Sequence, residues 1–149
     1  MRIIVDSGFW FGFMDKSDGY HKQAEEIFEK ISDHNPVFLI PYPSLYETLN
    51  TKMLRLRNHG NPRVHKFFTS LKAYPKQYIK VCDTNYRDKA FENTVSGNPR
   101  GLSFVDNIIR EMMCDKNQKI DALITFNTGD FIDVCTKEGI YIFDNNFEG

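Results

Sequence analysis

The sequence predicts a three-layer α/β/α sandwich around a mainly parallel sheet of about five strands. Short apolar segments, several of them rich in β-branched residues, alternate with longer segments whose apolar residues recur at helical spacing. The apolar segments lack the polar alternation of a strand that faces water on one side, which is typical of parallel strands covered on both faces. No internal repeat, linker or low-complexity segment divides the chain, so we expect one domain over residues 1–149.

The N-terminal part predicts a strand followed by a helix. Residues 2–5 form a β-branched run that ends at Asp6, and the aromatic segment after Ser7-Gly8 could begin a helix. From Tyr20 to Ile31, apolar residues recur at positions i, i+3, i+4 and i+7 and charged residues fill the other positions, which predicts an amphipathic helix. The apolar positions of this helix are Ala24, Ile27, Phe28 and Ile31.

The next segment predicts a second strand and two helices. The apolar run 37–40 lies between prolines and suits a buried parallel strand. Pro43-Ser44 is expected to start a helix that ends at the turn-forming segment 58–62, and 64–71 should form another helix. The first of these helices is expected to turn Leu45, Leu49, Met53 and Leu56 inward.

The second half of the chain continues the same alternation. Ser103 is a good N-cap for a helix whose apolar residues face the core. The predicted elements are a strand over 78–81, helices over 84–95 and 104–114, and strands over 120–125 and 139–143.

The composition is that of a soluble protein. The longest apolar runs are far shorter than the roughly 18 residues that a membrane span needs. An acid at position 6 interrupts the region where a secretory signal builds its apolar stretch. The three cysteines form no Cys-x-x-Cys pair and are expected to be reduced thiols that mostly serve packing. We therefore expect a cytoplasmic location without membrane attachment.

Four acidic residues are expected at one edge of the sheet. Asp6 follows the first strand, Glu47 lies one turn into the helix after the second strand, and Asp130 follows the fourth strand. Asp106 begins the helix that Ser103 caps. Ligands of open α/β sheets bind at the carboxyl ends of the strands, where these acids are predicted to lie.

Each of these residues also has a purely structural interpretation. Asp6 could be a solvated loop residue that caps the next helix, and Glu47 could form a capping box with Ser44. Asp106 suits the first turn of any helix, and Asn127 is a common turn former. A convergence of all four acids favours chemistry instead, because clustered carboxylates repel unless a cation, protons or hydrogen bonds compensate. Mg²⁺ or Mn²⁺ is the natural partner, and one or two such ions suit phosphodiester cleavage.

At this point the chain resembles the PIN-domain ribonucleases, and more narrowly the toxin nucleases of VapC-type toxin–antitoxin pairs. The matching segments occur in the order of the family and span nearly the whole chain. They are Ile3-Ile4-Val5-Asp6-Ser7, Asp18-x-x-His21-x-x-Ala24, Pro41-Tyr42-Pro43 through Glu47, Gly101-Leu102-Ser103-Phe104-Val105-Asp106, and Thr125-Phe126-Asn127 with Asp130-Phe131.

The resemblance implies an endoribonuclease whose metal-binding and catalytic acids are Asp6, Glu47, Asp106 and Asp130. It gives Ser7, Ser103, Thr125 and Asn127 supporting positions. It also implies an RNA substrate, a possible antitoxin and a possible homodimer. The chain departs from the family in its unusually aromatic segment 8–13 and in Asn127, where some members carry another acid. Which residue completes the shell of a second metal ion is therefore open.

The charge is divided unevenly along the chain. The net charge is −1, yet residues 48–82 carry eight Lys or Arg and no Asp or Glu. Such a stretch could steer RNA phosphates, with Tyr74 or Tyr78 stacking on bases, or it could bind an acidic antitoxin or be merely solvated. The RNA-binding candidates are Lys52, Arg55, Arg57, Arg63 and Lys66.

Two phosphate-handling classes lack their residues here. A phosphoacceptor receiver needs paired acids near the first strand and a lysine after the last one, but the last strand ends in Phe143-Asp144. A haloacid-dehalogenase-type phosphatase needs a second Asp two residues after Asp6, where Gly8 stands. The remaining alternatives are an RNA-processing PIN nuclease without an antitoxin and a non-catalytic RNA- or protein-binding module.

Overall fold

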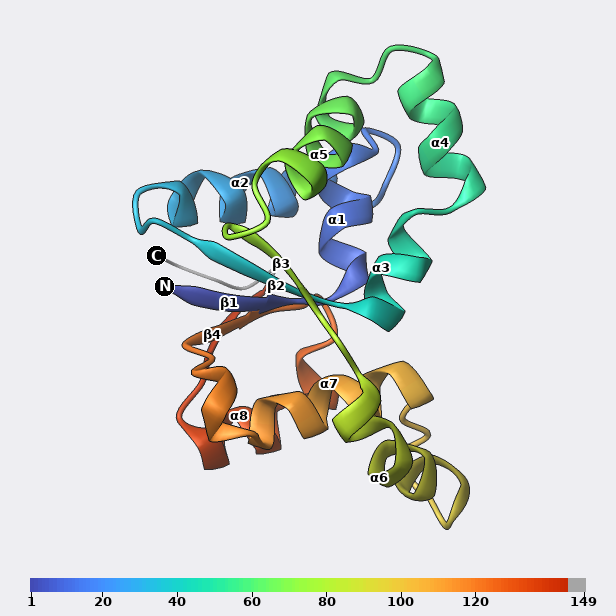
Figure 1. Cartoon of the computed structure of the whole chain (residues 1–149), viewed down its shortest axis with the longest axis vertical. Coiled ribbons are helices and arrows are strands. Elements are labelled where there is room, and N and C mark those ends of the chain that lie inside the picture. Colours follow the sequence, from blue (N-terminus) through green and yellow to red (C-terminus); the bar gives the residue numbers. More distant parts are fainter. Residues whose placement is uncertain (145–149) are drawn as a thin grey trace.

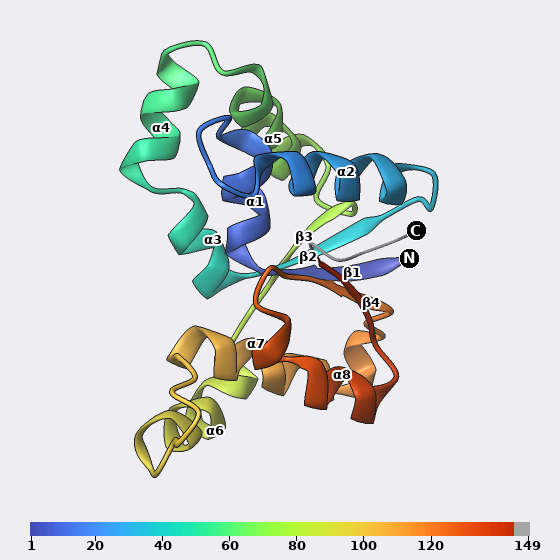
Figure 2. The ribbon, with the colours of Figure 1, turned by 180° about the vertical axis from the view of Figure 1, so that it is seen from behind.

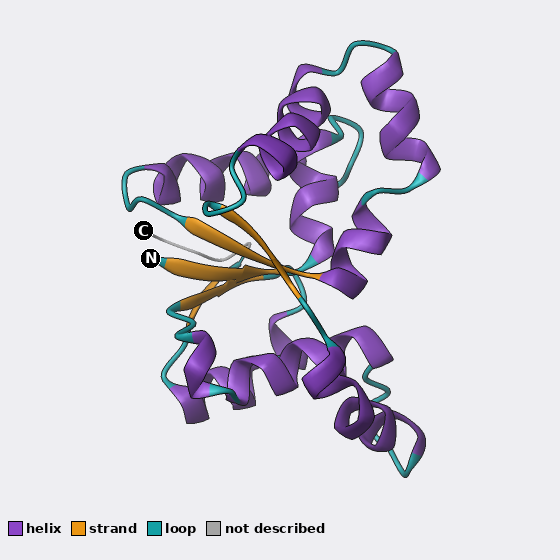
Figure 3. Cartoon of the chain, in the orientation of Figure 1, coloured by secondary structure: helices purple, strands orange, loops and turns teal. Residues whose placement is uncertain are grey.

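The computed structural model describes residues 1–144 and contains one five-stranded parallel sheet. The strand order is β3-β2-β1-β4-β5, and helices cover both faces of the sheet (Figures 1 and 3). The fold class predicted from the sequence is confirmed. The strands are β1 (Arg2–Val5), β2 (Val37–Pro41), β3 (Tyr78–Val81), β4 (Ala122–Ile124) and β5 (Tyr141–Phe143), so the last two are shorter than predicted.

The helices divide between the two faces by their order in the chain. The first five lie on one side of the sheet, and α6, α7 and α8 lie on the other, as the views from the front and from behind both show (Figures 1 and 2). Their bounds are α1 (Ser7–Met14), α2 (His21–Ser32), α3 (Tyr42–Thr48), α4 (Thr51–Asn58), α5 (Pro62–Ala73), α6 (Thr84–Val95), α7 (Phe104–Cys114) and α8 (Ile132–Glu138). Two 3-10 turns, η1 (Lys116–Gln118) and η2 (Thr128–Asp130), flank β4.

The alternation of side chains along each strand produces two separate cores. Successive side chains of a strand point to opposite faces, so Ile3 and Val5 join the core under α1–α5 while Ile4 joins the core under α6–α8. The first core is strongly aromatic, since Trp10 packs edge-on against Phe38 and lies 4.5 Å from Phe67 between ring centroids. The unusual aromatic segment after Ser7 thus supplies much of this packing.

The helix predicted from Pro43 to the break at Asn58 is two helices, so this prediction is wrong. Helix α3 ends at Thr48, and the side chain of Asn50 accepts a hydrogen bond from the Met53 amide at 3.0 Å as the N-cap of α4. Leu49 lies between them and is 38% exposed rather than inward-facing. An Asn side chain that satisfies the first amides of a helix favours a new helix start over continuation.

The segment Asp18-x-x-His21-x-x-Ala24, one of those that carry the family resemblance, packs α1 against α2. A Cβ atom at Gly12 would lie 3.3 Å from the Cβ of Ala24, so glycine permits this close approach. The Nδ1 atom of His21 lies 2.7 Å from the Gly12 carbonyl oxygen and ties the start of α2 to α1. The motif therefore has a structural role in this chain.

The structure of residues 1–144 also tests the expectations about membrane spans and about the cysteines. No helix in this part of the chain is long and apolar enough to cross a membrane. All three cysteines are free, but only Cys135 is buried, so the expectation that they mostly serve packing is wrong for Cys82 and Cys114. Those two thiols lie at the surface.

Candidate active site

The order of the strands places the candidate site between β1 and β4. The chain winds from β1 through β2 to β3, then crosses back to β4 and β5, so the direction of winding reverses between β1 and β4. Ligands of open α/β sheets bind at such a point, beyond the carboxyl ends of the strands. Asp6 and Thr125 directly follow these strands, and the Asp6 amide donates to the Ile124 carbonyl at 3.0 Å. The two side chains are therefore held next to each other.

Asp6 is a buried carboxylate with a hydrogen bond at each oxygen. Its Oδ1 accepts from the Ser7 amide at 2.9 Å as the N-cap of α1, and its Oδ2 accepts from the Thr125 hydroxyl at 3.1 Å. Burial, followed by repulsion from Asp106, raises the pKa of Asp6 to about 6 although both hydrogen bonds oppose this. Asp6 therefore does cap a helix, but with 7% exposure it is not the solvated loop residue of the structural alternative.

Glu47 does not belong to a capping box with Ser44. Helix α3 begins at Tyr42 after Pro41, which makes no side-chain cap, so Ser44 lies inside the helix. Within residues 1–144 the buried Ser44 hydroxyl has no hydrogen-bond partner. Glu47 lies at the surface, yet partial burial raises its pKa, opposed by a hydrogen bond with the Ser7 side chain and reinforced by Asp106. Glu47 thus faces the residue that follows Asp6.

Asp106 is the acid that interacts with the other three. Its amide donates to the Ser103 hydroxyl at 3.0 Å, which confirms Ser103 as the N-cap of α7. Burial is the main cause that raises the pKa of the half-buried Asp106 carboxyl, and Asp130 raises it further while Ser103 opposes the shift. Because Asp106 also raises the pKa of Asp6 and Glu47, its carboxylate lies within electrostatic reach of the whole set.

Asp130 lies at the end of η2, and Asn127 contributes to the same turn through its backbone. The Asn127 carbonyl accepts from the Asp130 amide at 3.0 Å, and the Asn127 amide donates to the Thr125 hydroxyl at 3.0 Å. The Asn127 side chain is exposed. These contacts are those of a turn former, so they favour the structural interpretation of Asn127. Thr125 connects this turn to Asp6 because its hydroxyl bonds to both.

The chemistry of these side chains fits a hard divalent cation. All four acids offer carboxylate oxygens, the ligands that Mg²⁺ and Mn²⁺ prefer, and burial, reinforced by repulsion between the acids, raises the pKa of Asp6, Glu47 and Asp106. In residues 1–144 no three His, Cys, Asp or Glu side chains stand close enough together to enclose an ion.

Three of the RNA-binding candidates already have partners in the fold. Lys52 forms an ion pair with Asp15 at 2.7 Å. Arg63 donates to Glu25 at 2.6 Å and to the Phe13 carbonyl at 2.8 Å. Arg57 lies over the ring of Phe68. Tyr78 packs within the aromatic core, whereas Tyr74 is exposed.

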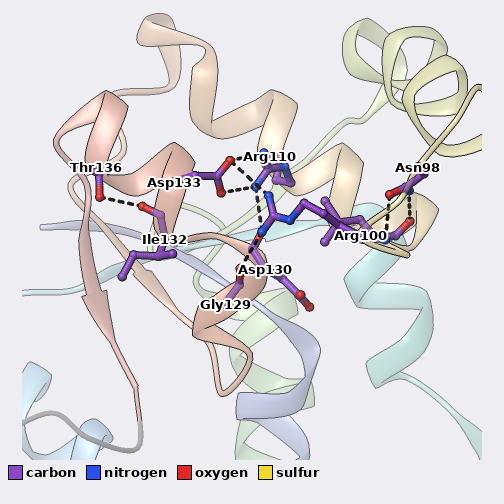
Figure 4. Close-up of polar contacts among 9 residues, drawn as sticks. Asn98, Arg100, Arg110, Gly129, Asp130, Ile132, Asp133 and Thr136 are labelled. Carbon is purple, nitrogen blue, oxygen red and sulfur yellow. Dashed lines mark hydrogen bonds and ion pairs between the residues drawn. The ribbon is translucent and has the colours of Figure 1, made fainter.

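Arg55 and Lys66 are exposed and have neither an ion pair nor a ring contact in the described part of the chain. Sequence reasoning also missed three charged residues beside Asp130. Arg110 of α7 donates to the Asp130 carbonyl at 2.8 Å and forms a two-bond pair with Asp133, while Arg100 donates to the Gly129 carbonyl at 2.6 Å (Figure 4). The only available signal was that Arg110 follows Asp106 by four residues, one helical turn.

The similarity to known proteins is structural. No protein-family model and no curated protein matches this sequence. A solved structure that matches is the Mycobacterium tuberculosis toxin VapC20, which cleaves the sarcin-ricin loop. The TM-score is 0.63 at 19% sequence identity, and the match covers 88% of this chain and 94% of VapC20. This chain has a VapC-like PIN fold. The fold predicted from the sequence resemblance is thereby confirmed over most of the chain.

Proposed function

We propose that this chain is a metal-dependent endoribonuclease, the toxin of a toxin–antitoxin pair, in which Asp6, Glu47, Asp106 and Asp130 hold Mg²⁺ or Mn²⁺. The observation that carries the proposal is the electrostatic coupling of these acids at the point where the sheet reverses its winding. Two findings support it further: the VapC-like PIN fold, and an oxygen-only set of side chains that suits a hard cation.

The residues of the chain divide the work at this site. Asp6, fixed through both oxygens by Ser7 and Thr125, offers a carboxylate that needs little reorganisation before binding an ion. Asp106 stands in reach of the other acids and would share the cation with them. A bound divalent ion would supply an activated water and stabilise the leaving oxygen of the RNA backbone. Ser7 would support Glu47 through a hydrogen bond to its carboxylate, and Ser103 fixes the start of the helix that carries Asp106 by accepting from the Asp106 amide.

The direct test is incubation of the purified chain with total RNA, with and without Mn²⁺, followed by mapping of the new RNA ends. Discrete ends that require Mn²⁺ are the expected result. Cleavage that persists in excess EDTA would refute the metal mechanism. Mn²⁺ binding without any cleavage would favour the non-catalytic RNA- or protein-binding module. A gene for an acidic partner immediately upstream would distinguish a toxin from an RNA-processing nuclease.

Metal binding should also appear in the melting temperature. In EDTA, Asp106→Asn should melt at or above the wild type, because the variant removes a charge that repels Asp6 and Glu47. At Mn²⁺ concentrations about a hundred times Kd, linkage stabilises the wild type by roughly 2.7 kcal/mol, or several degrees, and the variant by much less. Differential scanning fluorimetry measures both. If Mn²⁺ raises the melting temperature of both proteins equally, Asp106 does not belong to the proposed metal site.

The exposed basic residues are proposed to steer RNA toward the acids. Reversing Arg55, Arg57 and Lys66 to Glu should weaken binding of a labelled RNA several-fold and flatten its salt dependence, because phosphate contacts release counterions. The metal-free protein should keep its fold, since all three residues are exposed. Fluorescence anisotropy at several salt concentrations checks this. An unchanged affinity and salt slope would contradict RNA steering.

The same stretch borders a groove that suits the proposed antitoxin. A hollow of about 500 Å³ between α3, α4, α5 and β3 is lined by apolar side chains such as Leu45 and Leu54. Arg57, Lys72 and Lys80 also line it, so an acidic amphipathic helix would find both apolar and charged complements. If the charge reversals abolish antitoxin binding while RNA binding persists, the basic stretch serves the protein partner.

A further inference from the structure

Arg110 ties helix α7 to the turn that carries Asp130. Its Nη1 donates to the backbone carbonyl of Asp130 at 2.8 Å, and its Nη1 and Nη2 donate to the two carboxylate oxygens of Asp133, each at 2.8 Å. Such a two-bond pair fixes the plane of the guanidinium as well as its position. Arg110 lies one helical turn after Asp106, so this contact joins the two elements that carry Asp106 and Asp130.

Arg100 adds a second contact from the loop between α6 and α7. It donates to the Gly129 carbonyl at 2.6 Å and lies 3.3 Å from Asp133. The loop is held by Asn98, whose side chain accepts from the Leu102 amide and donates to the Leu102 carbonyl. Two consecutive carbonyls of η2 therefore each accept from a guanidinium, and Asp133 contacts both arginines (Figure 4).

The position of Asp130 depends on these backbone contacts. Figure 4 shows its carboxylate pointing away from both guanidinium groups. Within residues 1–144 this carboxylate accepts no hydrogen bond. The turn is a single short 3-10 segment, a geometry with weak internal hydrogen bonds. Arg110 holds the pKa of Asp133 well below its usual range, so the ion pair persists at neutral pH.

We infer that Arg110 is a positioning residue, assisted by Arg100 and Asp133, that holds Asp130 where its carboxylate can share a metal ion with Asp106. The contacts of Arg110 and Arg100 with η2 and Asp133 are called the clamp below. The inference rests on the proposed function for the metal and on these hydrogen bonds for the clamp. Residues outside the ligand shell that orient ligands change metal affinity about 10- to 100-fold in other proteins. We therefore expect loss of the Arg110 side chain to weaken metal binding by a factor in this range.

The test compares Arg110→Gln with Arg87→Gln. Arg87 of α6 forms the same kind of two-bond pair with Asp83, the residue that precedes this helix, at 3.0 Å for each bond. Isothermal titration of the metal-free proteins with Mn²⁺ should show at least about tenfold weaker binding for Arg110→Gln and less than twofold change for Arg87→Gln. With a short RNA oligonucleotide, Arg110→Gln should lower kcat by a similar factor and leave KM within about twofold.

Arg110→Lys separates positioning from charge. Lysine keeps the positive charge but cannot bind Asp133 through two bonds and the Asp130 carbonyl together, so this variant should behave like Arg110→Gln. Asp133→Asn, at a surface residue, provides a second variant should Arg110→Gln fail to fold, and it should also weaken Mn²⁺ binding. Wild-type Mn²⁺ affinity in folded Arg110→Gln or Arg110→Lys would overturn the inference.

Hydrogen exchange separates this inference from the proposed function. The amides of Asp130 and Phe131 donate to Asn127 and Thr128 within the clamped turn. In metal-free protein they should exchange at least about tenfold faster in Arg110→Gln than in Arg87→Gln, since loss of the clamp lowers the local opening energy. If the wild type neither binds Mn²⁺ nor cleaves RNA, the proposed function fails, and faster exchange still establishes the clamp. Equal exchange in both variants overturns the clamp as well.

Discussion

Asp6→Asn and Asp106→Asn are each expected to reduce RNA cleavage by at least about two orders of magnitude. Each change removes a negative charge from the proposed ligand set and keeps the shape of the side chain. The fold should persist, because Asn is a good N-cap and can still accept from the Ser7 amide at position 6. Initial cleavage rates of an RNA oligonucleotide in Mn²⁺, with circular dichroism of each variant, measure the effect.

Asp88→Asn is the matched control for these two variants. It makes the same substitution at an exposed position of α6 and should cleave RNA at the wild-type rate. A folded Asp6→Asn and a folded Asp106→Asn that both cleave as fast as this control would reject the metal-nuclease assignment. Loss of activity in all three would indicate a general effect of the substitution.

The stability of the metal-free chain should depend on pH through Asp6. The pKa of Asp6 is about 6 in the folded chain and 3.8 when unperturbed, so the folded state binds the proton more tightly. Its contribution to stability is complete below pH 3.8 and is lost as the pH rises to about 6 and above. The difference corresponds to about 3 kcal/mol, an order-of-magnitude value for a buried group.

Asp6→Asn cannot titrate at this position and isolates the effect. In EDTA, the free energy of unfolding of the variant minus that of the wild type should increase by about 2–3 kcal/mol between pH 4 and pH 7. Urea unfolding at several pH values measures this difference. Mn²⁺ should reduce it, because the ion binds the deprotonated carboxylate. A difference that stays constant across this pH range would mean that Asp6 ionises normally.

The sequence predicted the sheet better than the helix boundaries around it. Parallel strands are buried on both faces, so runs such as 37–40 are recognisable from hydrophobicity alone. The break between α3 and α4 depends instead on one side-chain bond from Asn50. A pattern of apolar spacing does not distinguish that bond from a helix that continues, and Leu49 was therefore placed inward.

Three of the candidate acids could be proposed from the sequence because Asp6 and Asp130 follow strands and Asp106 lies in the first turn of a helix, whereas Glu47 lies near the end of α3 rather than one turn into it. The contacts that surround each acid could not be predicted in this way. The hydroxyl of Thr125 reaches Asp6 across 119 positions of sequence, and Arg110 reaches Asp133 across 23, so both pairings depend on how the layers pack. The sequence also did not show which basic residues are already paired within the fold, since the partner of Arg63 lies on α2.

The two hydrogen bonds of the Asp6 carboxylate affect how a descendant of this chain that has lost its activity could be recognised from its sequence. Selection for folding alone would retain Asp6, because it caps α1 and anchors Thr125 whether or not RNA is cut. Asp130 accepts no hydrogen bond through its carboxylate in residues 1–144, so mutational drift would reach it early once activity is no longer needed. In a descendant of this chain, an intact position 6 would be weak evidence of surviving catalysis, and an intact position 130 would be much stronger.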